Sequence, residues 1–385
     1  MAITKVTGAL LGNYTGGSAD DTVVVGDGAG VAITTGVDNT FIGDNAGTAT
    51  TSGGTNVAVG NEALAANTTG ASNASVGASS LDANTTGTSN TAVGANALSA
   101  NTTADNNTAV GRNALLLNTT GTQNTALGSG TVTFNTTADN NTGVGFNALN
   151  ANTTGSQNTA VGAASLDANT TGSNNSAFGR EALTKSTTGS HNTGLGYEAL
   201  KENTTASYNT GIGYQALKLN TTAGSNTGVG GFALTAATTG NVNAGFGYAA
   251  LQGVTTGTNN TGLGYASGQS ITTGANNIAL GTNALNSGRP GGQVTTASNI
   301  IGIGNADHTA AHIQIDWTVA SDERDKTDFT ALDLGLGFVK KLEPFTYRWD
   351  KRSKYSDQTP DGTHKEDWLD VGFKAQDVEI LEEEA

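Results

Sequence analysis

The chain has 385 residues, a formal net charge of −15 and 55 glycines, but only 3 prolines and 5% aromatic residues. An acidic chain without basic clusters suits neither nucleic acid nor anionic membranes, so we expect neither partner. The scarcity of large apolar side chains excludes ordinary globular cores, and no apolar run approaches the roughly 18 residues that span a bilayer. Cysteine is absent, which excludes disulfides and thiolate chemistry.

Residues 1–21 precede the regular part of the chain. They begin Met1-Ala2-Ile3-Thr4-Lys5, which lacks the charged-then-apolar pattern of a secretory signal. We therefore expect any extracellular location to be reached by another route, such as release of a particle by lysis.

A 17-residue repeat dominates the chain from 22 to 304. Sixteen glycines recur every 17 residues from Gly26 to Gly281, each directly after a large apolar residue. An unbroken period of this length is typical of stacked coils, in which each coil buries its faces against its neighbours.

Within one unit, a segment such as Thr91-Ala92-Val93 predicts a short strand, and the following Gly94 predicts a turn that needs a positive φ or a missing side chain. Leu98 follows four residues later and recurs in most units. We expect the residue before the Gly and this Leu to face inward. Asn stands four residues before the Gly in fifteen of the sixteen units, which predicts an Asn ladder along the stack.

The predicted fold is mainly β: an elongated parallel β-roll or solenoid of about sixteen coils, followed by a small α+β domain. Coils at a sheet spacing of about 4.8 Å would span about 77 Å. A lone rod this thin exposes much edge and apolar surface, so we expect a homotrimer.

The repeats resemble the β-roll heads of trimeric autotransporter adhesins. They resemble the repeats of phage tail-fibre-like proteins still more closely, as in Tyr214-Gln215-Ala216-Leu217-Lys218-Leu219-Asn220-Thr221-Thr222. After Gly281 the register breaks. Residues 286–292 indicate an inserted loop, 299–304 a last degenerate coil that caps the stack, and 305–320 a connecting strand.

The tail carries 29 of the chain's 49 charged residues after position 300, which marks a different domain at 321–385. Three segments in order resemble the S74 intramolecular chaperone of phage endosialidases and tail fibres: Ser321-Asp322-Glu323-Arg324-Asp325-Lys326, Leu342-Glu343-Pro344-Phe345-Thr346-Tyr347-Arg348-Trp349, and Val371-Gly372-Phe373-Lys374-Ala375-Gln376-Asp377-Val378-Glu379. The resemblance implies a domain that promotes trimer assembly and then cleaves itself off at Ala320-Ser321.

In that family the motif serine supplies the nucleophile and the lysine the base, which implies Ser321 and Lys326 here. A lysine acts as a base only when neutral, so its pKa must be lowered. Asp325 departs from the family's usual apolar residue and favours the protonated lysine. Without the resemblance, Ser321 and the acidic residues after it indicate a helix N-terminus. The same domain also predicts an amphipathic helix from about 330 to 342 and a strand over 345–349.

Tyrosines directly follow the repeat Gly in several late coils, at Tyr197, Tyr214, Tyr248 and Tyr265. Such a row, with gaps, suits contact with a glycan, and packing between chains of a trimer explains it as well. The four histidines are too scattered for a zinc site, and we expect no metal and no cofactor. Asn-Thr-Thr triplets match the N-glycosylation acceptor, but a regular repeat produces them automatically.

These features together predict a phage tail fibre or tailspike that attaches to a host surface. Its partners would be its own copies, other virion tail proteins through 1–21, and a host receptor, for instance a glycan. It would be made in the host cytoplasm and reside in the virion tail. The alternative is a bacterial trimeric surface adhesin with the same chaperone tail. An enzyme that acts on host glycans would need a carboxylate pair, which the nearly uncharged repeats do not offer.

Overall fold

The computed structural model describes residues 21–286, 293–307, 341–348 and 370–374. The chain divides into two compact units, 1–307 and 308–385. In the described part of the first unit, every strand belongs to one parallel sheet of 17 strands. None of the described residues forms a helix that is long and apolar enough to cross a membrane.

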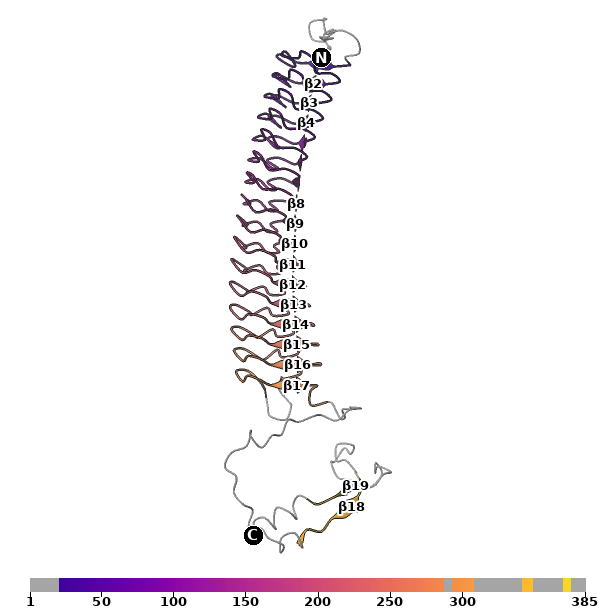
Figure 1. Cartoon of the computed structure of the whole chain (residues 1–385), viewed down its shortest axis with the longest axis vertical. Helices are drawn as coiled ribbons and strands as arrows, with labels where there is room; N and C mark the ends of the chain where they lie inside the picture. Colours follow the sequence, from indigo (N-terminus) through magenta and orange to yellow (C-terminus); the bar gives the residue numbers. More distant parts are fainter. Residues whose placement is uncertain (1–20, 287–292, 308–340, 349–369, 375–385) are drawn as a thin grey trace, which may run out of the picture. The chain divides into compact units, whose positions relative to one another are not determined.

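Each strand of the first unit is three residues long and pairs in parallel with the next strand along the chain. Figure 1 shows them stacked along the length of the unit, as in a solenoid. The strands are β1 (Val23–Val25), β2 (Thr40–Ile42), β3 (Val57–Val59), β4 (Ala74–Val76), β5 (Thr91–Val93), β6 (Thr108–Val110), β7 (Thr125–Leu127), β8 (Thr142–Val144), β9 (Thr159–Val161), β10 (Ser176–Phe178), β11 (Thr193–Leu195), β12 (Thr210–Ile212), β13 (Thr227–Val229), β14 (Ala244–Phe246), β15 (Thr261–Leu263), β16 (Ile278–Leu280) and β17 (Ile301–Ile303).

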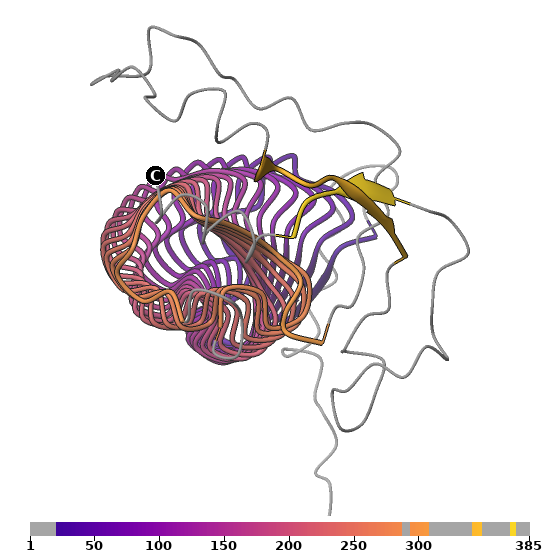
Figure 2. The same cartoon turned by 90° about the horizontal axis from the view of Figure 1, so that it is seen from below.

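The predicted parallel β-solenoid is therefore confirmed, with β1 to β16 starting every 17 residues. The step from β16 to β17 is longer than one repeat, because Ile278 pairs with Ile301. The additional length equals that of 287–292, which lies within the predicted insertion. The predicted last coil around 299–304 is also confirmed, because β17 continues the same sheet. Figure 2 shows the coils superimposed in the view along the stack.

The core of the solenoid consists mostly of Ala and Leu. In a typical coil, Ala92, Ala97 and Leu98 are fully buried. The prediction that the Leu faces inward is confirmed, but the prediction for the apolar residue before the repeat Gly is wrong. Val93 is 38% exposed and Leu127 is 48% exposed. The strand period of two explains this: the middle residue of each strand, which is small in all coils except those of Val24 and Phe41, faces inward, so the residues on either side of it face outward.

The repeat Gly is required for two reasons, as its pattern predicted. Gly94 has φ +135°, a conformation that side-chain-bearing residues rarely adopt. A Cβ there would also lie 2.7 Å from the carbonyl carbon of Gly111, the equivalent residue of the next coil. The backbones of consecutive coils therefore approach each other at a corner where no side chain fits.

Two columns of buried asparagines run along the solenoid. The predicted ladder is confirmed: the backbone N–H of Asn90 donates to Asn73 Oδ1 at 3.0 Å. A second ladder, which the sequence reasoning missed, uses the Asn of the Asn-Thr-Thr triplet, where Asn118 Nδ2 donates to Asn101 Oδ1 at 3.1 Å. Within a coil the two ladders meet, since Asn73 and Asn84 both donate through Nδ2 to the Gly87 carbonyl, at 2.9 and 3.0 Å. The buried asparagine side chains therefore fill part of the interior, where an ordinary globular protein would have large apolar side chains.

The second ladder is interrupted where the sequence departs from Asn. Ser186 replaces Asn in one coil, and three coils later the ladder ends at Ala237, which Val254 and Ile271 follow at the same position. In both places the preceding side-chain oxygen, Asn169 Oδ1 or Asn220 Oδ1, is buried without a hydrogen-bond partner, as is Ser186 Oγ. Each Asn Oδ1 of the second ladder therefore depends on the Nδ2 of the next asparagine as its hydrogen-bond donor.

The described part of the second unit is a small antiparallel pair, β18 (Phe345–Tyr347) with β19 (Asp370–Gly372). The strand predicted over 345–349 is confirmed for 345–347, and Arg348 lies beyond its end. Phe345 pairs with Gly372, so two of the three segments that resemble the S74 chaperone lie side by side. The helix expected over 330–342 and the strand within 305–320 lie almost wholly outside the described residues.

Candidate functional site

The late coils carry a continuous column of aromatic side chains. Tyr197, Tyr214, Tyr248 and Tyr265 follow the repeat Gly of their coils, as the sequence indicated. The expected gap at Gly231 does not exist, because Phe232 from the next position fills it. Its ring lies 5.1 Å from that of Tyr214 and 5.6 Å from that of Tyr248. The adjacent pair Gly231-Phe232 was the available signal for this substitution, since the missing side chain leaves room for the neighbouring ring.

The rings of this aromatic column cover each other's faces. Tyr197 stacks on Tyr214 and Tyr248 on Tyr265, both with centroids 5.5 Å apart, and Phe232 meets its two neighbours edge to face. The guanidinium of Arg180 lies 5.1 Å from the centre of the Tyr197 ring. Tyr214 and Tyr265 are nevertheless 49% and 55% exposed. The column therefore presents ring edges and hydroxyl groups more than open ring faces.

A network of ion pairs links three coils in the same region. Glu198, whose side chain is only 8% exposed, accepts hydrogen bonds from Lys201 at 2.8 Å and Lys218 at 2.6 Å, and Gln215 donates a third at 2.7 Å. Lys201 also bonds Glu181 in the preceding coil at 2.7 Å. The hydrogen bond from Lys201, then that from Lys218, holds the pKa of Glu198 down at about 2. The network thus fixes the register of neighbouring coils through charge.

This network predicts a pH dependence of stability. The pKa of Glu198 is lower in the folded protein than in the unfolded chain, so its contribution is present above the unfolded value of about 4.3 and is lost as the pH falls toward 2. We expect the midpoint of thermal unfolding to fall by a few degrees between pH 5 and pH 2.5, and to fall less in Glu198→Gln. The measurement is circular dichroism melting across this pH range.

The control is Glu62→Gln, at the same repeat position, where the described residues show no ion pair to Lys or Arg. It should keep the acid sensitivity of the wild type. Equal pH slopes in the wild type and Glu198→Gln would contradict the role of the network.

The outward side of the sheet forms a second surface, which we call the outer strand face. It consists of the first and third residue of each strand from β1 to β17, such as Thr159 and Val161 in β9. None of these residues is buried, and none is charged. The first column is mostly Thr and the third is entirely Val, Ile, Leu or Phe, with Phe178 39% exposed and Phe246 40% exposed. A narrow, neutral, largely apolar strip therefore runs the length of the solenoid.

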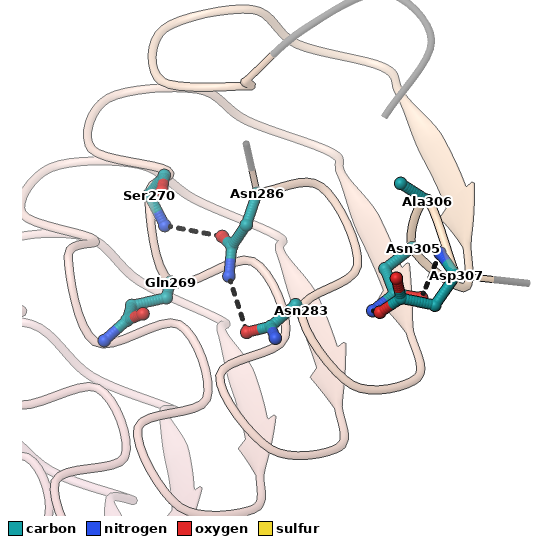
Figure 3. A pocket seen from close by; sticks show the side chains of 7 residues that line it. All are labelled: Gln269, Ser270, Asn283, Asn286, Asn305, Ala306 and Asp307. Carbon is teal, nitrogen blue, oxygen red and sulfur yellow. Dashed lines mark hydrogen bonds between the residues drawn. The ribbon is translucent and has the colours of Figure 1, made fainter. Parts of the chain in front are cut away.

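A polar cavity of about 400 Å³ lies at the end of the solenoid near β17. Figure 3 shows side-chain amides around it, with Asn286 Oδ1 accepting from the Ser270 N–H at 3.2 Å and Asn305 Oδ1 accepting from the Asp307 N–H at 3.1 Å. Asn286 Nδ2 also donates to the Ala266 carbonyl at 2.6 Å, and Gln269 Nε2 donates to Gln252 Oε1 at 2.6 Å. Within the described ranges, no group of three or more His, Asp or Glu side chains could hold a metal ion. The cavity is lined by Gln269, Ser270, Asn283, Asn286, Asn305, Ala306 and Asp307.

The residues predicted to carry catalysis, Ser321 and Lys326, and the predicted cleavage site after Ala320 lie outside the described residues. The Asn of the Asn-Thr-Thr triplets is described, and in the second ladder it is fully buried, as at Asn118. These positions are therefore closed to glycosylation in the folded solenoid.

A comparison with protein families identifies the tail. Residues 321–385 match the Peptidase_S74 family, described as the chaperone of endosialidase. The protein thus combines a β-solenoid of 17-residue repeats with a C-terminal segment that matches the chaperone-of-endosialidase family. This combination fits a tail-fibre or endosialidase-like protein, as the sequence indicated. No curated protein matches the chain.

Proposed function

We propose that this protein is the shaft of a phage tail fibre or tailspike that attaches the particle to a host surface. The observation that supports this most strongly is the S74 chaperone match directly behind a long β-solenoid. A solenoid whose coils are linked by ladders and a continuous sheet is stiff. Among its described residues, the neighbouring carboxylates of Glu181 and Glu198 both bind Lys201, which does not favour the acid and nucleophile roles of glycan hydrolysis. Its role is to hold a receptor-binding surface away from the particle, with 1–21 as the attachment segment.

Residues 321–385 act in this proposal as an intramolecular chaperone. Solenoid strands pair between coils that are one repeat apart, and an incomplete stack exposes an unpaired sheet edge that invites aggregation. A C-terminal segment that brings three copies together aligns their last coils and lets pairing propagate from one end. The antiparallel pair of β18 and β19 supplies a local fold for this segment that is separate from the solenoid.

The chaperone then releases itself by cleavage of the Ala320-Ser321 bond. Ser321 Oγ attacks the Ala320 carbonyl carbon, and the carbon–nitrogen bond breaks to leave an ester on Oγ and a free amine on Ser321. Lys326 as a neutral amine takes the hydroxyl proton and returns one to the leaving nitrogen. Water hydrolyses the ester, which gives a carboxylate on Ala320 and restores the hydroxyl of Ser321.

The cleavage is tested by the intact mass of the full chain under denaturing conditions. We expect the wild type to give two fragments divided at Ala320-Ser321, and Ser321→Ala to give one chain of 38.4 kDa. Ser356→Ala is the matched control and should be cleaved like the wild type. An uncut wild-type chain would restrict residues 321–385 to a folding role.

The aromatic column is our proposed contact with a host receptor, with a glycan as the favoured class. Outward ring edges and hydroxyls can pack against and hydrogen-bond a ligand that is rich in hydroxyl groups. We expect Tyr248→Ala combined with Tyr265→Ala to reduce adsorption of the labelled protein to host cells at least tenfold. Melting curves check that the solenoid stays folded.

Phe134→Ala, an exposed aromatic outside the column, should leave adsorption unchanged. If the double variant adsorbs like the wild type, the receptor contacts another surface.

A further inference from the structure

The outer strand face has features of a surface that is covered in the assembled protein. It exposes an aliphatic or aromatic side chain on every strand from β1 to β17, in a single unbroken line. Monomeric soluble proteins rarely expose contiguous apolar strips of this extent, and such strips mark interaction sites. Among the described residues, the strip belongs to the outward side of the sheet, and the core lies behind its other side.

Charge selects the kind of partner. The chain is acidic, with a formal charge of −15, so two copies repel each other over most orientations. When identical rods lie parallel and in register, each column of one copy meets the same column of another copy. A column of like charges would therefore face the same charges on the other copy and be repelled. The outer strand face avoids this, because neither of its two columns carries any charge, whereas Arg112, Glu62 and Lys201 all lie in other columns.

The dimensions of the face also fit a stable interface. Three residues of strand are about 10 Å wide, and sixteen strand spacings of about 4.8 Å are about 77 Å long. The product is roughly 770 Å², close to the roughly 800 Å² that each partner buries in a standard protein interface. A face this narrow is fully covered when copies meet around one axis parallel to the rod.

We propose that the outer strand face is the surface through which copies of this chain associate, parallel and in register, with Val161 of one copy next to Val161 of the others. The parallel direction rests on the proposed function, because chaperone segments must lie at the same end to act on one assembly. The column of Val, Ile, Leu and Phe residues then forms a second, intermolecular core, and the Thr column borders it.

The absence of cysteine allows a direct test in the full-length protein. Thr159→Cys and Val161→Cys each place one thiol on the outer strand face of β9, while Thr154→Cys places one on an exposed position away from it. Both substitutions on the face are small and outward, so the coil should fold as before. We expect mild oxidation to give intermolecular disulfides in at least one of the two face variants, several-fold more than in Thr154→Cys.

Register is tested with two differently tagged chains that are co-expressed, Val161→Cys and Val229→Cys, whose thiols lie four coils apart. The proposal expects disulfides within each type and none between the types. Disulfides between types, or disulfides only in Thr154→Cys, would overturn it.

A variant with a charge on the outer strand face tests whether the face is needed for association. Val161→Lys should lower the native mass toward that of one chain in light scattering, and Thr154→Lys should leave the mass unchanged. An assembly of unchanged mass in Val161→Lys, with no disulfides through the face, would reject this interface but leave the proposed attachment function intact. A wild-type chain that is monomeric in solution yet adsorbs to cells would reject self-association alone.

Discussion

Gly94→Ala is expected to destabilise the solenoid by roughly 3 kcal/mol or more. The new Cβ would lie 2.7 Å from the carbonyl carbon and oxygen of Gly111 and 3.1 Å from the Arg112 nitrogen. These are backbone atoms of the next coil, so no side-chain rotation relieves the contact. The φ of +135° adds backbone strain that any L-residue with a Cβ experiences. Thermal and urea unfolding followed by circular dichroism measure the loss.

Gly54→Ala is the matched control. A Cβ there would come no closer than 3.1 Å to the Val37 carbonyl oxygen, and Ala71 already occupies the equivalent position one coil later. We expect a change within about 0.5 kcal/mol, typical of a surface substitution. Similar losses in the two variants would show that the corner at the repeat Gly tolerates a side chain.

Breaking the second Asn ladder should have the next largest effect. In Asn118→Ala, the buried Asn101 Oδ1 loses its donor, while Asn135 Nδ2 loses its acceptor at 2.8 Å but keeps its bond to the Ala138 carbonyl at 3.0 Å. A buried polar group that is left unsatisfied costs roughly 1–3 kcal/mol, and we expect a loss of that size. Urea unfolding should show the loss, and Asn61→Ala, an exposed position where the next coil has Ala78, should not.

The chain also offers the reverse experiment. Ser186→Asn inserts the amide that the ladder lacks between Asn169 and Asn203. Most other coils already carry a buried Asn at this position of the repeat. Asn169 Oδ1 would gain a donor, and we expect stabilisation by about 1 kcal/mol. A loss in Ser186→Asn together with no loss in Asn118→Ala would contradict the role assigned to the ladder.

The repeat period predicted the fold class, the strands, the glycine corner and the first ladder, because each depends on contacts between equivalent residues of adjacent coils. The sequence could not reveal which apolar column faces inward. Val93 and Leu98 have similar hydrophobicity, and the choice depends on the turns between them, where Asn96 and Leu98 adopt φ +58° and +52°. A leucine with positive φ contradicts local propensity and is set by coil packing.

The candidate functional site could also be predicted only in part from the sequence. The tyrosine row followed from the period, but Phe232 belongs to another column, and only the three-dimensional stack shows that its ring completes the row. The ion network was not predicted, since Glu198 and Lys218 belong to successive coils and occupy different positions of the repeat, and they meet only when the coils stack. The S74 segments were recognised from their residues, and the family match covers the same range.

The hydrogen bonds of each coil reach mostly to the coil directly before or after it. The number of coils is therefore free to vary in evolution without redesign of any contact, provided that sequence is gained or lost in whole repeat units. Each unit changes the length of the solenoid by about 4.8 Å, the spacing of neighbouring strands. The repeat thus acts as a molecular ruler, because the number of units sets the length of the solenoid.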